Sequence, residues 1–121
     1  MKVTIASPDK ISLSLCTSYL KFCLGKEYHQ GETHSLMTPE ALKVYTEGCL
    51  KRSEKYIFSY YAKKKINAEP LKVVPEILIN NSDLVIWMNL YSMDWVILKD
   101  TSNQAPYYYD RWKKNIEKFN F

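Results

Sequence analysis

Two apolar runs in the last third of the chain constrain the fold most strongly. The first spans residues 84–91 and is interrupted only by Asn89, and the second spans residues 95–98. Both have the length of strands and are apolar on both alternating faces, as in strands that are covered on both sides. Residues 92–94 form a short connection, so we predict a β-hairpin. A buried helix remains the alternative, because short apolar runs do not distinguish the two.

The stretch after the N-terminal residues admits two interpretations. As a helix over residues 7–25, it has Ser7 as N-cap, Pro8 at the first helical position and Gly25 at the end. As a hairpin, it begins with a turn, and residues 11–15 then alternate strictly between apolar and polar. We favour the helix because both of its ends carry capping residues.

The remaining N-terminal half is predicted to contain a strand, a loop and a long helix. Residues 2–6 alternate as a short strand does, and residues 26–37 are polar and are expected to form a loop. Thr38 as N-cap and Pro39 in the first turn open a helix. Its apolar residues stay on one wide stripe at 100° per residue, which predicts a helix as far as about residue 65.

The C-terminal segment YYYDRWKKNIEKF, residues 107–119, raises the question of nucleic-acid binding. On a helical wheel its apolar residues share one face, and its cations share the opposite edge with Tyr107. A base-stacking surface needs aromatic and basic residues interleaved, and here they segregate. We therefore predict an amphipathic helix that docks on the sheet. The apolar face consists of Tyr108, Tyr109, Trp112, Ile116 and Phe119, and the basic edge of Arg111, Lys114 and Lys118.

Together these elements predict an α+β fold. A chain of 121 residues suits one domain, and an apolar fraction of 46% is enough for a core. We predict a single compact domain over residues 1–121, with about three helices packed on a small, mainly antiparallel sheet.

Positive charge is concentrated in one segment. Residues 51–65 carry six basic residues against Glu54 alone, a net charge of +5, whereas the whole chain has +4. Cations at a helix C-terminus also favour the helix dipole, which is a structural explanation for part of the segment. Its functional interpretation is contact with an acidic partner. The six cations are Lys51, Arg52, Lys55, Lys63, Lys64 and Lys65.

No residue pattern indicates catalysis. His29 and His34 lie with Glu27 and Glu32 in the predicted loop, but their spacing matches no standard zinc signature. The three cysteines are expected to be reduced thiols. We therefore predict no catalytic residue, no metal and no cofactor. With neither a signal peptide nor an apolar run of about 18 residues, we expect a cytoplasmic protein without membrane contact.

These features favour a small, non-enzymatic binding protein. We expect it to block or sequester a macromolecular partner with an acidic surface, as phage-encoded inhibitors and immunity proteins do. The composition also hints at a phage or other mobile element. The predicted partner surface consists of the six cations of residues 51–65 together with Tyr107, Arg111 and Lys114.

Three alternatives stay open at this level. The first is nucleic-acid or anionic-nucleotide binding through the same cations, with Tyr107 or Tyr28 stacking on bases. The second is a histidine- or metal-dependent hydrolase centred on His29 and His34. The third is self-association into a homo-oligomer, which is common among small proteins.

Overall fold

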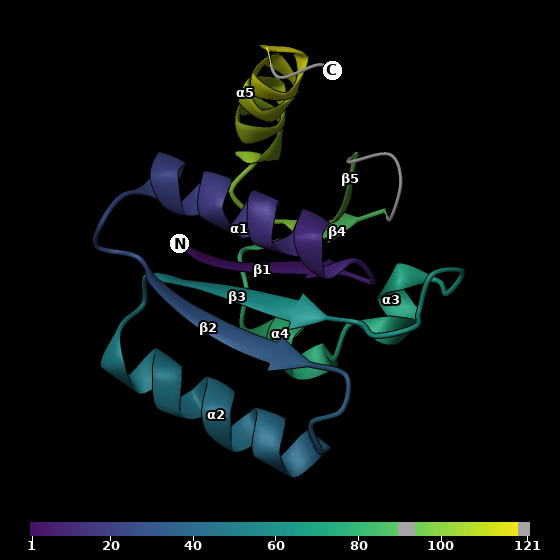
Figure 1. Ribbon diagram of the computed structural model, residues 1–121. Helices are drawn as coiled ribbons and strands as arrows, with labels where there is room; N and C mark the ends of the chain where they lie inside the picture. The colour runs from purple at the N-terminus through teal and green to yellow at the C-terminus, as the bar shows by residue number, and fades with distance from the viewer. Residues whose placement is uncertain (90–93, 119–121) are drawn as a thin grey trace.

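A computed structural model of the chain describes residues 1–89 and 94–118. The described residues form five helices and five strands around one sheet (Figure 1). In chain order the elements are β1 (Lys2–Ser7), α1 (Lys10–Leu24), β2 (His29–His34), α2 (Pro39–Arg52), β3 (Tyr56–Tyr61), α3 (Pro70–Val73), α4 (Glu76–Asn80), β4 (Leu84–Met88), β5 (Trp95–Asp100) and α5 (Ala105–Lys118).

The sheet has the order β2-β3-β1-β4-β5 and is mostly parallel. The pairs β1–β3, β1–β4 and β2–β3 are parallel, and only the β4–β5 hairpin is antiparallel. The predicted α and β content is confirmed, but the sheet is not mainly antiparallel and carries more helices than three. Parallel neighbours need crossover connections, and α1 and α2 supply two of them.

The predicted polar loop at residues 26–37 is wrong in its centre, because His29–His34 forms β2. This strand lies at one edge of the sheet and pairs only with β3. Along it, the buried residues Gly31 and Thr33 alternate with the exposed residues Gln30, Glu32 and His34. Polar residues can form this strand because one of its faces is open.

The helix predicted from Thr38 begins as expected but ends early. The hydroxyl of Thr38 accepts the backbone N–H of Ala41 at 3.1 Å, as an N-cap does, and α2 ends at Arg52. Its predicted continuation to residue 65 is wrong, since Tyr56–Tyr61 forms β3. The aromatic residues of this segment fit a helical stripe, but they also fit a strand covered on both faces, and tyrosine and phenylalanine favour strands.

The helical interpretation of the first 25 residues is confirmed. The helix α1 begins at Lys10, and its N-cap is Asp9 rather than Ser7, which ends β1 and is buried. Gly25 ends the helix with φ of 111°, a conformation that favours glycine.

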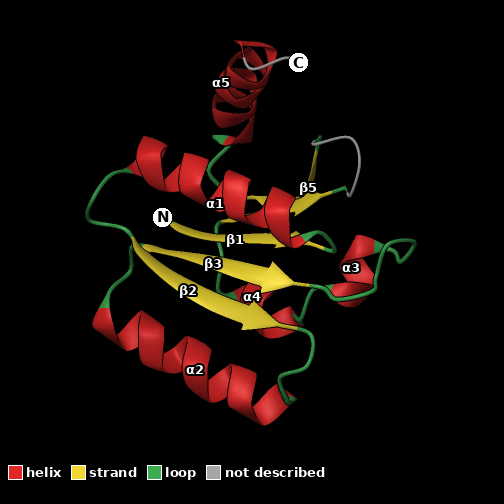
Figure 2. Ribbon diagram, viewed as in Figure 1, coloured by secondary structure: helices red, strands yellow, loops and turns green. Residues whose placement is uncertain are grey.

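Two apolar layers cover the sheet, one on each face. The helices α1 and α5 lie on one face, and α2 and α4 lie on the other (Figure 2). The strand β4 is buried throughout, as predicted for a strand covered on both sides. In β5, Val96 and Ile97 are exposed, because this strand forms the other edge of the sheet. Of the predicted connection of the hairpin, residues 92–94, only Asp94 belongs to the described residues.

The C-terminal helix docks through the predicted aromatic face. Trp112 is only 5% exposed, and its ring centroid lies 5.2 Å from that of Tyr19 in α1 and 6.0 Å from that of Trp95 in β5. The helix therefore packs against α1 and the hairpin. Phe119, which was predicted on the same face, lies outside the described residues. Among the described residues, no helix is long and apolar enough to cross a membrane.

Candidate functional site

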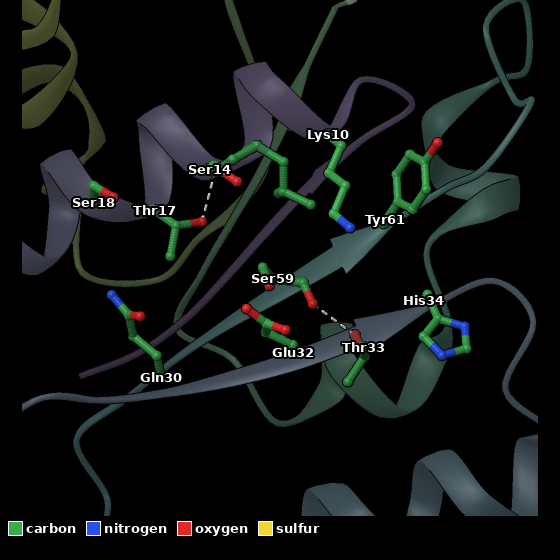
Figure 3. A pocket seen from close by; sticks show the side chains of 11 residues that line it. Lys10, Ser14, Thr17, Ser18, Gln30, Glu32, Thr33, His34, Ser59 and Tyr61 are labelled. Carbon is green, nitrogen blue, oxygen red and sulfur yellow. Dashed lines mark hydrogen bonds between the residues drawn. The ribbon is translucent and has the colours of Figure 1, made fainter.

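The helix α1 divides its surface into sides of different chemistry. Leu13, Cys16 and Leu20 face the core, as expected for residues three and four apart on one stripe. A neighbouring stripe is polar and faces the side of the sheet where β2 lies (Figure 3). It consists of Lys10, Ser14, Thr17 and Ser18.

The sheet opposite this stripe is also polar. On β2 the side chains of Gln30, Glu32 and His34 share one face because they are two residues apart. In the parallel register Glu32 lies beside Ser59 of β3, and His34 lies beside Tyr61. The apolar layer under α1 thus gives way to polar residues toward the β2 edge. A cleft of about 280 Å³ lies between the polar stripe of α1 and the polar residues of β2 and β3. We call it the α1–β2 cleft.

Several polar side-chain groups in the α1–β2 cleft form no hydrogen bond or ion pair with the described residues. Lys10 extends from α1 toward β2 and β3 (Figure 3). Its amine forms no ion pair or hydrogen bond with the described residues, and neither the Glu32 carboxylate nor the Tyr61 hydroxyl has a hydrogen-bond partner among them. These groups are therefore available to a ligand.

His34 lies where β2 ends, and its ring is oriented by the backbone. Its Nδ1 accepts the N–H of Leu36 at 3.2 Å. In the neutral ring the proton is then on Nε2, which is left as a hydrogen-bond donor.

The N-terminus of α1 does not offer its amides to the cleft. The Asp9 carboxylate accepts the N–H groups of Ile11 and Ser12, both at 3.3 Å, and the Ser12 hydroxyl at 2.6 Å. The Ser12 hydroxyl is the main cause that holds the pKa of Asp9 below its usual value. Helix N-termini often bind anions, but here the protein's own carboxylate occupies that position. An anion in the cleft would instead meet Lys10.

Part of the basic segment lies at the carboxyl ends of the parallel strands, as Lys10 does. The loops after β2 and β3 are joined, because the N–H of Lys63 donates to the Ser35 hydroxyl at 3.1 Å and the N–H of Ser35 donates to the carbonyl of Tyr61 at 3.0 Å. Lys63, Lys64 and Lys65 are exposed here. They add positive charge near the end of the cleft where His34 lies.

The structure does not gather the six cations of residues 51–65 into one patch. Lys51 and Arg52 end α2, and Lys55 precedes β3, where it forms an ion pair with Glu27. The lysine triplet follows the other end of β3. A strand of six residues spans about 20 Å, so the two groups are well separated.

The residues of α5 lie away from both groups. Arg111 donates to the hydroxyl of Tyr107 at 3.2 Å and lies 5.6 Å from the centre of its ring. Lys114 is exposed on the same helix. Because α5 covers the face opposite α2 (Figure 1), Arg111 and Lys114 do not share a surface with Lys51. The predicted joint surface is therefore not assembled.

The two histidines are also kept apart. His29 and His34 begin and end β2, five residues apart, so they are separated by about 17 Å and their side chains point to opposite faces. A metal ion shared by both is incompatible with this geometry. Residues 1–89 and 94–118 contain no group of three or more residues that could hold a metal ion. Tyr28 cannot stack on a base, since it is buried and its hydroxyl accepts the terminal amine of Met1 at 3.0 Å.

Sequence reasoning missed the cleft because it missed β2 and β3. Once these segments are recognised as strands, the period of two puts Glu32, His34, Ser59 and Tyr61 on one face. The alternation in HQGETH was the available signal, but the segment lacks the apolar residues that usually mark a strand.

Comparison of the chain with models of protein families, with curated proteins and with solved structures found no match. The chemistry of the α1–β2 cleft must therefore be derived from its own groups. It combines a cation at Lys10, a carboxylate at Glu32, an imidazole donor at His34 and a phenol at Tyr61. This set can bind an anionic group at one point and hydroxyl groups at others.

Proposed function

We propose that the α1–β2 cleft binds a small anionic molecule that also carries hydroxyl groups, such as a phosphorylated sugar. The observation that carries this proposal is the amine of Lys10, which extends toward β2 and β3 without an ion pair to any described residue (Figure 3). A binding role also agrees with the absence of a recognisable catalytic pattern in the sequence.

The anionic part of the ligand is assigned to the end of the cleft near His34. Lys10 and the Nε2–H of His34 supply a cation and a hydrogen-bond donor there, and charge-assisted bonds of this kind are stronger than neutral ones. Lys63, Lys64 and Lys65 follow the carboxyl end of β3, near this end of the cleft, and their positive charge favours the approach of an anion.

The hydroxyl-bearing part is assigned to the middle of the cleft. The Glu32 carboxylate accepts hydrogen bonds only, whereas Gln30 and Ser14 can both donate and accept. The volume of about 280 Å³ lies just below the usual range of ligand pockets, roughly 300–1,000 Å³, so the ligand must be small. A phosphorylated pentose is a ligand of suitable size.

The proposal is tested with ribose 5-phosphate, compared with ribose and with sulfate. A ligand that binds only the folded state raises the melting temperature in a concentration-dependent manner. We expect ribose 5-phosphate to raise it and ribose to have a much smaller effect. Lys10→Ala should weaken the effect by about tenfold or more, since a hydrogen bond to a charged group contributes about 1.5–3 kcal/mol.

A matched control is Lys72→Ala on α3, where an exposed lysine pairs with Glu69 at 3.3 Å. This variant should bind ribose 5-phosphate as the unaltered chain does. Equal effects of ribose 5-phosphate and sulfate, or no loss in Lys10→Ala, would contradict the proposal.

A second candidate is the macromolecular partner predicted from the sequence. All of the cations proposed for it are exposed, as such a contact requires, and Lys51 with Arg52 forms one compact part of the surface. The double change Lys51→Glu and Arg52→Glu should abolish capture of that partner while lowering the melting temperature only slightly, because both cations lie in the last turn of α2 and favour its dipole. Capture that survives the change would remove this surface from the hypothesis.

A further inference from the structure

A second cavity lies on the other face of the sheet, next to the end of β2. It has a volume of about 390 Å³ and is formed where the start of α2, the turn before it and the start of α4 meet. Most of its wall is apolar, and His34 is the one residue that lines both this cavity and the α1–β2 cleft among the described residues. The apolar wall consists of Met37, Pro39, Leu42, Pro75 and Ile77, with the ring of Tyr60. We call this space the α2–α4 cavity.

Tyr60 carries a polar group that the protein does not satisfy. The residue is only 5% exposed, and its hydroxyl forms no hydrogen bond with any of the residues that the structure describes. Burial alone raises its pKa, with no contribution from a hydrogen bond or a neighbouring charge. The hydroxyl oxygen itself is not fully buried, so it opens into the α2–α4 cavity. Because Tyr60 lines the α2–α4 cavity, a molecule in the cavity is positioned to supply a hydrogen-bond partner.

The two prolines of the cavity wall offer a ligand no hydrogen-bond donor. Pro39 and Pro75 have no backbone N–H, and the carbonyl of Pro75 already accepts the N–H of Leu78 at 3.1 Å. Lys43 and Glu76 also line the cavity, and both are exposed and carry opposite charges. Their charges offset each other, so the lining favours neither an anion nor a cation.

We infer that the α2–α4 cavity is a second binding site, for a small neutral and apolar molecule with one hydrogen-bond acceptor. The apolar body of the ligand contacts Met37, Leu42 and Ile77, and its acceptor receives the proton of the Tyr60 hydroxyl. The inference does not depend on the α1–β2 cleft, because its ligand, its wall and its hydrogen bond are different. An aryl ketone has the required combination of an apolar body and a carbonyl oxygen.

The test compares acetophenone with ethylbenzene, which has a similar shape but no acceptor. Protein labelled with ¹³C at methyl groups is titrated with each molecule and followed by NMR. We expect saturable shifts of the Met37, Leu42 and Ile77 methyl signals, with acetophenone binding about two- to tenfold more tightly, the gain of one neutral hydrogen bond. Shifts that do not saturate, or that occur elsewhere, would overturn the inference.

Two variants separate the cavity from a general affinity for apolar molecules. Tyr60→Phe should reduce acetophenone binding to the level of ethylbenzene and leave the melting temperature unchanged or higher, since the hydroxyl it removes has no protein partner. Met37→Trp fills the cavity from the turn before α2 and should prevent binding of both molecules. Tyr107→Phe on α5 is the matched control and should change nothing.

Acetophenone that binds Tyr60→Phe and the unaltered chain equally well would refute the role of the hydroxyl, and binding that survives Met37→Trp would refute the site itself. Neither result bears on the response to ribose 5-phosphate, because that response depends on Lys10.

Discussion

The hydroxyl of Tyr45 accepts the backbone N–H of Glu32 at 3.2 Å. Tyr45 belongs to α2, and Glu32 lies on β2, whose outer edge pairs with no other strand in the described sheet. The bond connects the helix on one face to the strand that carries the polar face of the α1–β2 cleft. It also covers part of an open edge, which proteins usually protect against pairing with another chain.

Removing this hydroxyl should weaken the edge of the sheet. We expect Tyr45→Phe to lower the free energy of unfolding by about 0.5–1.5 kcal/mol, because one intramolecular hydrogen bond is lost. Urea denaturation measures the change. Tyr107→Phe, at an exposed tyrosine of α5, should change the free energy of unfolding by less than about 0.5 kcal/mol. Equal effects in both variants would mean that the contact between Tyr45 and Glu32 contributes nothing.

Gly31 should not tolerate a side chain. A Cβ atom at this position would lie 2.9 Å from Cδ1 of Phe58 and 3.1 Å from the Tyr45 hydroxyl, and Phe58 is buried and held in the core. We expect Gly31→Ala to destabilise the fold by about 1–3 kcal/mol, the usual effect of overpacking.

Gly48 provides a control of opposite sign. It lies inside α2, and a Cβ atom there would meet no atom within 4 Å. Gly48→Ala should therefore stabilise the protein by about 0.5–1 kcal/mol, because alanine favours the helix. Denaturation curves of the two variants should shift in opposite directions, and a shift in the same direction would contradict the packing described around Gly31.

The cap at Asp9 should make stability depend on pH. Its pKa is lowered in the folded state, so its contribution is present above the unfolded pKa of about 4 and is lost as the pH falls through the folded value. We expect Asp9→Ala to cost about 1 kcal/mol at pH 7 and progressively less in acid. Thermal denaturation between pH 7 and pH 2 measures this, with Asp9→Asn as a cap that does not titrate. A pH-independent difference would refute the role of the charge.

Docking of α5 should depend on Trp112. Its ring lies between those of Tyr19 and Trp95, at centroid distances of 5.2 and 6.0 Å. Trp112→Ala should lower the free energy of unfolding by about 3–5 kcal/mol, as large core truncations do. Trp112→Phe, which keeps an aromatic ring, should lose clearly less. If truncation to alanine costs less than about 1 kcal/mol, α5 is not held by this contact.

Elements with strong local signals could be predicted from the sequence. The starts of α1 and α2 carry capping residues, Gly25 ends α1, and the apolar run at residues 84–88 is long enough for a buried strand. The face of α5 also followed from its helical period, because Tyr108, Tyr109, Trp112 and Ile116 recur at helical spacing and pack against the core.

The sheet order could not be predicted from the sequence. Because β2 and β3 were not recognised as neighbouring strands, the cleft that they line was missed as well. The strand β2 is polar because one of its faces is open, and β3 carries a hydroxyl at Ser59 where it faces the cleft. Strand patterns reflect which neighbours cover each face, and those neighbours come from distant parts of the chain. The +5 segment was interpreted as one patch because it was placed on a single continuous helix, whereas β3 puts its two groups of cations at opposite ends of a strand.

Ligand binding in the α1–β2 cleft is tested most simply by a ¹H–¹⁵N NMR titration of the unaltered chain with ribose 5-phosphate. We expect saturable shifts of the amide signals along the α1–β2 cleft, at Lys10, Ser14, Gln30, Glu32 and His34, with little change in α2 and α5. Shifts confined to Lys63, Lys64 and Lys65, or the absence of any saturable shift, would contradict a ligand site in this cleft.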